Sequence, residues 1–124
     1  MLAALLIVTG SWAGDCARIS PNDIGRIDPP AVVVLVERRG TLSDLWRANQ
    51  LVRKLSRRAP TTLALEAAHH ARQPAIDRYE QGLTGFEELA LELAWSDYWD
   101  FPITPYRPLL VSAQRGVSVK AIGV

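Results

Sequence analysis

Two hydrophobic stretches of this sequence each end in a glutamate. Residues 31–36 are all apolar and run directly into Glu37, and the stretch TTLAL of residues 61–65 leads to Glu66 in the same way. Two carboxylates that share one site bind a metal, share a proton or act as an acid–base pair. The alternative without chemistry is that each carboxylate pairs with a neighbouring arginine, and candidates for such pairing are Arg38, Arg39 and Arg72.

Two histidines follow the second glutamate. His69 and His70 carry imidazole groups, which in the neutral form are good ligands for zinc or iron. Adjacent residues of an extended segment point to opposite sides, so we expect at most one of them to reach the same site as Glu66. The alternative is that both histidines belong to an exposed loop.

Aromatic residues crowd into residues 95–106. At this density they line a pocket for a flat apolar ligand or form a satellite core. Tyr106 stands out because a phenolate can be an axial ligand of haem iron. The adjacent Arg107 favours the phenolate or pairs with a haem propionate. The aromatic residues are Trp95, Tyr98, Trp99, Phe101 and Tyr106.

A strand–helix–strand unit positions these residues. The β-branched run over 31–37 and the stretch over 61–67 predict strands buried in a parallel sheet, and apolar spacing predicts an amphipathic helix over 42–58. If the two strands are neighbours, their backbones lie about 5 Å apart and both glutamates enter one crevice at the carboxyl edge of the sheet. A third strand is expected over 117–124.

Helix signals fill the sequence between the second and third predicted strands. Thr84 and Glu87 form a capping box, and Gly82 and Gly116 are good helix stops. The fold class is therefore α/β, a three-layer-type βαβ arrangement with a short parallel sheet and several helices. Since no helix follows the last strand, we expect the N-terminal part of a larger domain.

The N-terminal region carries an export signal or a first strand. Residues 1–13 are read as a signal peptide cut after Ala13, and the alternative is a buried strand. Residues 14–30 are a linker rich in Gly, Pro, Asp and Asn. Cys16, the single cysteine of the 124 residues, is then a lipid attachment point, a free thiol or an intermolecular partner. The net charge of +1 gives no reason to expect a nucleic-acid partner.

As a set, these features resemble a known family. The stretches LE…RQPAIDRY…G and W…YRPLL within residues 31–124 are similar to those of the ChaN-like haem-binding uptake domain of the Tiki superfamily. The resemblance implies a haem-binding, non-enzymatic protein of iron uptake, exported to the periplasm or the outer membrane, often lipid-anchored and paired with a second copy. Matching positions carry over haem-site roles, with Tyr106 as the best candidate for the tyrosine ligand and His69 or His70 as substitutes for lost ones. These positions are Glu37, Glu66, Gln73, Trp95, Tyr106 and Arg107.

The sequence departs from the family pattern at its first motif. Where the family has Gly-Glu-x-His, this chain has Val36 and Arg39 in place of the glycine and the histidine, and a guanidinium does not ligate a metal at neutral pH. Ala67 and Ala68 replace a Met-Phe pair, which removes apolar bulk. Two alternatives to haem binding follow: a metal-dependent hydrolase, which needs both glutamates and a histidine together, and a truncated member without a competent site.

Overall fold

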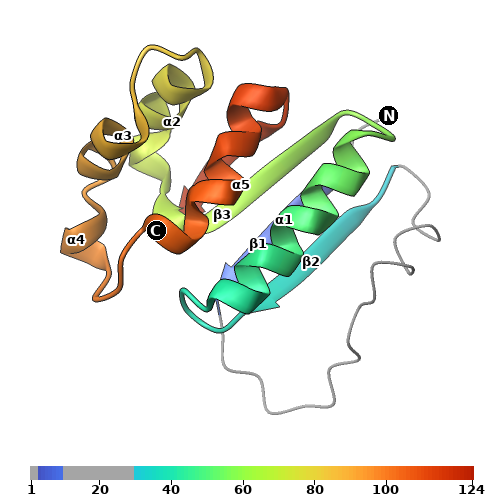
Figure 1. Cartoon of the computed structure of the whole chain (residues 1–124), viewed down its shortest axis with the longest axis horizontal. Helices are drawn as coiled ribbons and strands as arrows, with labels where there is room; N and C mark the ends of the chain where they lie inside the picture. Colours follow the sequence, from blue (N-terminus) through green and yellow to red (C-terminus); the bar gives the residue numbers. More distant parts are fainter. Residues whose placement is uncertain (1–2, 10–29) are drawn as a thin grey trace.

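The fold is built on a parallel sheet with helices packed on one face. The computed structural model describes residues 3–9 and 30–124 (Figure 1). All three strand pairings are parallel and the strand order is β2-β1-β3-β4, which confirms the α/β class. The strands are β1 (Ala3–Thr9), β2 (Val32–Glu37), β3 (Thr61–His69) and β4 (Ser118–Gly123).

The two glutamate-bearing strands are not neighbours, so the condition for a shared crevice is not met. Strand β1 lies between β2 and β3, so their backbones are two strand spacings apart, roughly 10 Å. Leu35 and Leu65 both pair with Ile7, which places the odd-numbered residues of β2 and β3 on the same face. Glu37 lies on that face and Glu66 on the other. Local sequence patterns do not encode which strand pairs with which, so the position of β1 between β2 and β3 could not be predicted.

The N-terminal hydrophobic residues form a strand, β1, which was the alternative to a signal peptide. Ala3–Thr9 is paired on both sides, with β2 and with β3. A cut after Ala13 would remove β1, so a four-stranded sheet and a cleaved signal peptide exclude each other in the same mature chain. Residues 10–29, which include Cys16 and most of the predicted linker, lie outside the described residues.

The helices follow β2 and β3 and cover the same face. From β2 to β3 to β4 the chain moves in one direction across the sheet, so right-handed crossovers place both sets of helices on one side. Helix α1 ends two residues before its predicted end. In chain order the helices are α1 (Leu42–Ser56), η2 (His70–Arg72), α2 (Gln73–Glu80), α3 (Phe86–Glu92), α4 (Trp95–Tyr98), η3 (Thr104–Tyr106), α5 (Arg107–Val111) and η4 (Ser112–Arg115).

The two faces of the sheet differ in their cover. On the helix side, residues such as Leu63, Leu65 and Val119 are buried in one core with α1 and α5. On the other side, the side chains of β2 are open to solvent, with Val32 70% exposed, and Ile122 of β4 is also exposed. The hypothesis of a truncated member expects exposed apolar side chains on the last strand, β4. Among the described residues, the exposed apolar side chains are more numerous and more exposed on β2 than on β4.

The predicted capping box of α3 is wrong. The helix begins at Phe86 with Gly85 as its N-cap, so the Thr84 hydroxyl is one residue too early to cap it. This hydroxyl is buried and has no hydrogen-bond partner among the described residues. The predicted stops are confirmed, because Gly82 and Gly116 end their helices with positive φ. No helix of the described part of the chain is long and apolar enough to cross a membrane.

Gly40 joins the end of β2 to α1 and lies against the ring of Phe101. Its φ is +65°, and a Cβ at this position would lie 2.7 Å from Cδ2 of Phe101. Gly82 has a similar φ of +71° and nothing within 4 Å. The pair therefore separates the conformational cost of a left-handed residue from the cost of crowding Phe101.

We predict that Gly82→Ala lowers the free energy of unfolding by about 1 kcal/mol, because only the left-handed backbone is strained. Gly40→Ala is expected to cost more, by roughly a further 1–3 kcal/mol, because the methyl group overpacks against Phe101. Urea denaturation of the two variants measures the difference. Equal losses of stability would show that Phe101 does not restrict this turn.

Candidate functional site

A buried hydrogen bond joins Glu37 to Tyr106. The Tyr106 hydroxyl donates to Oε1 of Glu37, and it connects the carboxyl end of β2 to the turn before α5. Glu37 is 3% exposed and Tyr106 is 1% exposed. The second carboxylate oxygen, Oε2, is buried and has no partner among the described residues. The geometry therefore brings together two of the predicted site residues, in a place closed to solvent.

Burial changes the ionisation of the carboxyl group. Desolvation raises the pKa of Glu37 from its ordinary value of 4.5 to about 7. A backbone hydrogen bond with Gly40 opposes this shift, and the negative charge of Asp44 adds to it. At neutral pH the Glu37 carboxyl is therefore divided between its protonated and ionised forms.

Aromatic rings cover the Glu37–Tyr106 pair. The Trp95 ring centroid lies 5.0 Å from that of Tyr106, and Phe101 lies 5.8 Å from Trp95 in an edge-to-face contact. Both indole nitrogens donate to backbone carbonyls, Trp95 to Phe101 and Trp99 to Ala67. With its polar groups satisfied, the cluster packs as part of the core, which is the satellite-core alternative. Tyr98 is the exception, because it is half exposed.

Glu66 belongs to a different place. It lines a hollow of about 310 Å³ at the carboxyl edge of the sheet, together with Trp99, Ile122, Gly123 and Val124. We call this the edge hollow. The Arg39 guanidinium lies over the Trp99 ring, 5.6 Å from its centroid, and brings a positive charge beside the hollow.

The two histidines lie beside the edge hollow, on the same side of the chain. Their rings stack with centroids 4.6 Å apart, and the Tyr98 ring also stacks with that of His69, with centroids 5.6 Å apart. The expectation that adjacent histidines point apart is wrong, because β3 ends at His69 and the 3-10 helix η2 begins at His70.

Hydrogen bonds distinguish the two imidazoles. His70 Nδ1 lies 2.9 Å from the carbonyl oxygen of Gly123, and a carbonyl only accepts, so Nδ1 carries the proton and Nε2 has the lone pair. His69 Nδ1 accepts from the backbone N–H of Ala71, so its proton is on Nε2 when the ring is neutral. An imidazole oriented by a carbonyl through one nitrogen is the usual arrangement of a metal-ligating histidine. Of the two, His70 is the one with this arrangement.

Two other predicted site residues have other contacts. Gln73 clamps α2 to β4, since its amide nitrogen donates to the Val119 carbonyl and its oxygen accepts from the Ala121 N–H. The Arg107 guanidinium lies over the Phe86 ring, 5.0 Å from its centroid. The predicted set is thus divided into a buried group around Tyr106, a group around His70 and two residues outside both.

The geometry does not bring together the ligands that a metal-dependent hydrolase requires. Such a site needs both glutamates and a histidine, and Glu37 and Glu66 lie on opposite faces of the sheet. Within residues 30–124, no three side chains of the His, Cys, Asp or Glu types are grouped to hold a metal ion.

The sequence profile that describes haem-binding uptake proteins of the ChaN type, in the Tiki superfamily, matches residues 24–124. The chain belongs to the ChaN family. No curated protein and no solved structure matches it closely enough to count as a relative. The resemblance seen in the sequence motifs is therefore confirmed, and the matched region of this ChaN-family chain contains both the buried pair and the edge hollow.

Sequence reasoning missed the role of two residues. Tyr98 was grouped with the buried aromatic residues, whereas it extends the histidine stack at the surface. Arg39 was considered as a lost histidine and as a partner for a carboxylate, whereas its contact with Trp99 places a cation at the edge hollow. Tyr98 is flanked by Asp97 and by Trp99, whose indole carries an N–H group. These polar groups gave a weak signal that this turn reaches the surface.

The raised pKa of Glu37 predicts a specific pH dependence of stability. The folded state holds this proton more tightly than the unfolded state, so the free energy of unfolding falls as pH rises from about 4.5 to about 7 and is constant above. The fall amounts to roughly 3 kcal/mol. Glu37→Gln keeps an acceptor for Tyr106 without a charge, so this variant should be more stable than the wild type at pH 8 and similar to it at pH 4.5. Urea denaturation at both pH values tests this, and parallel profiles of the two proteins would contradict it.

Proposed function

We propose that this ChaN-family chain binds haem as a non-enzymatic protein of iron uptake, with His70 as the iron ligand. The observation that carries the proposal is the hydrogen bond between His70 Nδ1 and the Gly123 carbonyl, which leaves Nε2 as a lone-pair donor on an exposed ring. No hydrogen bond within the described residues engages Nε2. Bound haem supplies an iron atom that accepts an imidazole as axial ligand.

The surroundings of His70 suit a flat ligand with an anionic edge. The stack of His70, His69 and Tyr98 offers aromatic surface, and Trp99 and Ile122 line the adjoining edge hollow. The Arg39 guanidinium over Trp99 is a partner for a propionate. A volume of about 310 Å³ is at the lower end of the range for small-molecule sites, so the hollow would cover only part of a haem.

Tyr106 is the competing ligand, and the structure gives it another role. Its hydroxyl is enclosed by the aromatic cluster and donates to Glu37. Ligation of iron by Tyr106 would require this bond to break and the cluster of Trp95 and Phe101 to open. In the described conformation Tyr106 instead satisfies one oxygen of a buried carboxyl group, which would otherwise have a large desolvation cost.

Export, pairing and lipid attachment belong to the same proposal. A haem-uptake role is expected in the periplasm or at the outer membrane, where a second copy of the chain and a lipid on Cys16 are both in keeping with the family. Family membership supports this location. Cys16 is outside the described residues, so the lipid anchor is a proposal from the sequence. A cut before Cys16 would remove β1, so the anchored form would keep only β2, β3 and β4 of the sheet.

A haem titration of the full chain tests the proposal. The wild type should give a saturable Soret shift, and His70→Ala should weaken binding about tenfold or more because the axial ligand is lost. His69→Ala is the matched control, because it removes a stacked imidazole that has the opposite tautomer. This variant should weaken haem binding less than His70→Ala does. Tyr106→Phe should bind haem as the wild type does, while its unfolding free energy falls by about 1–3 kcal/mol.

Two results would contradict the proposal. A spectrum identical to that of free haem would exclude haem binding by this chain. A Soret shift that survives in His70→Ala and disappears in a folded Tyr106→Phe variant would transfer the ligand role to Tyr106.

A further inference from the structure

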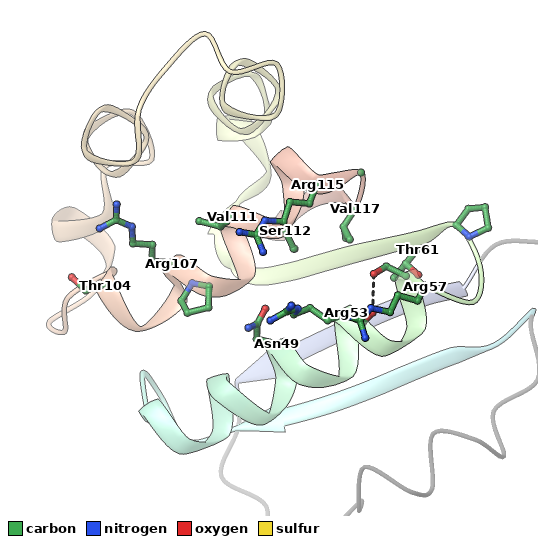
Figure 2. A pocket seen from close by; sticks show the side chains of 14 residues that line it. Asn49, Arg53, Arg57, Thr61, Thr104, Arg107, Val111, Ser112, Arg115 and Val117 are labelled. Atoms are coloured by element: carbon green, nitrogen blue, oxygen red, sulfur yellow. Dashed lines mark hydrogen bonds between the residues drawn. The ribbon is translucent and has the colours of Figure 1, made fainter.

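A second concave site lies far from His70 along the strands. It is a groove of about 680 Å³ between α1 and the segment formed by α5 and η4, where β3 begins and just before β4 (Figure 2). His70 is at the opposite end of β3. The volume of the groove is within the usual range of small-molecule sites. We call it the arginine groove.

Arginines line both sides of this groove. Arg53 and Arg57 come from the last turns of α1, and Arg115 comes from η4 on the opposite wall (Figure 2). Arg107 is at the margin, with its guanidinium over Phe86. None of the lining residues is acidic. Three positive charges therefore line the groove and a fourth lies at its margin, on a chain with a net charge of only +1.

Two ion pairs between described residues, Arg38 with Asp44 and Arg78 with Glu92, involve none of the groove arginines. Arginines at the end of α1 are partly explained by the helix dipole, which favours cations at a C-terminus. Arg115 is likewise in the last turn of η4, so the dipole accounts for a cation at each helix end but not for the two ends facing each other across one groove. Fixed like charges that converge on a concavity are favourable when an anion occupies it.

Three hydroxyl groups of the groove already donate to backbone carbonyls, and Asn49 and Thr104 also line it. The hydroxyl of Thr61 donates to the Ala59 carbonyl, and that of Ser56 donates to the Arg53 carbonyl. Ser112 donates in the same way to Leu109. Guanidinium groups, which bind phosphate and carboxylate oxygens with two parallel hydrogen bonds, therefore supply most of the donors.

We propose that the arginine groove binds a small organic or inorganic polyanion that carries at least two phosphate or carboxylate groups. Arginines on facing walls are suited to two separate anionic groups of one molecule, whereas a single anion would neutralise only one wall. This site is independent of the proposed haem site, because it shares no residue with the edge hollow or the histidine stack.

Calorimetric titration of the full chain with tripolyphosphate and with citrate, at fixed ionic strength, tests the inference. At least one probe should bind saturably, and the pair shows whether phosphate or carboxylate is preferred. Arg53→Gln and Arg115→Gln should each weaken binding about tenfold, because each loses a charged bidentate contact. Arg47→Gln is the matched control, since it removes the same charge from an exposed position of α1 outside the groove.

The outcomes separate this site from the haem site. His70→Ala should leave anion binding unchanged, and Arg53→Gln should leave the Soret titration unchanged. The inference is overturned if neither probe binds, if Arg47→Gln weakens binding as much as the groove variants do, or if the groove variants lose haem, which would make the groove part of the haem site.

Discussion

The hydrogen bond from Tyr106 to Glu37 is the interaction around which this end of the molecule is organised. A buried carboxyl group has a high free-energy cost unless it is neutralised or hydrogen-bonded, and here both occur in part: Tyr106 satisfies one oxygen, and burial raises the pKa to about 7. The bond joins residues 69 positions apart and so fixes α5 against the end of β2. The aromatic cluster then excludes water from the pair. A residue that appeared suited to ligate iron is, in this arrangement, a structural partner.

With Tyr106 enclosed, the surface chemistry is found at the two ends of the sheet. At the carboxyl ends of the strands, where ligands of open parallel sheets usually bind, the chain offers His70, the ring stack and the edge hollow. At the opposite ends lie the arginines of α1 and η4. The helices cover one face of the sheet, because successive right-handed crossovers run in one direction, and β2 leaves its valines exposed on the other face.

The sequence predicted the elements better than their arrangement. The apolar run before Glu37 and the spacing in α1 determine a strand and a helix locally, and both predictions are confirmed. The place of β1 depends on long-range pairing, which no local pattern encodes, and this one strand separates Glu37 from Glu66. The tautomers of His69 and His70 depend on partners at Ala71 and Gly123, and the second partner is 53 residues away. Family motifs identified the family, and the three-dimensional contacts show which of the matched residues are enclosed and which lie at the surface.

The central claim is that iron in this chain is bound by an imidazole at the edge of the sheet and that Tyr106 stays with Glu37. Resonance Raman spectroscopy of the ferric haem complex of the full chain tests it directly, because an iron–phenolate bond has its own enhanced vibrations. The account predicts a spectrum without these vibrations, unchanged in Tyr106→Phe and altered in His70→Ala. Iron–phenolate vibrations that disappear in Tyr106→Phe would contradict it and would show that the buried pair opens to take the haem.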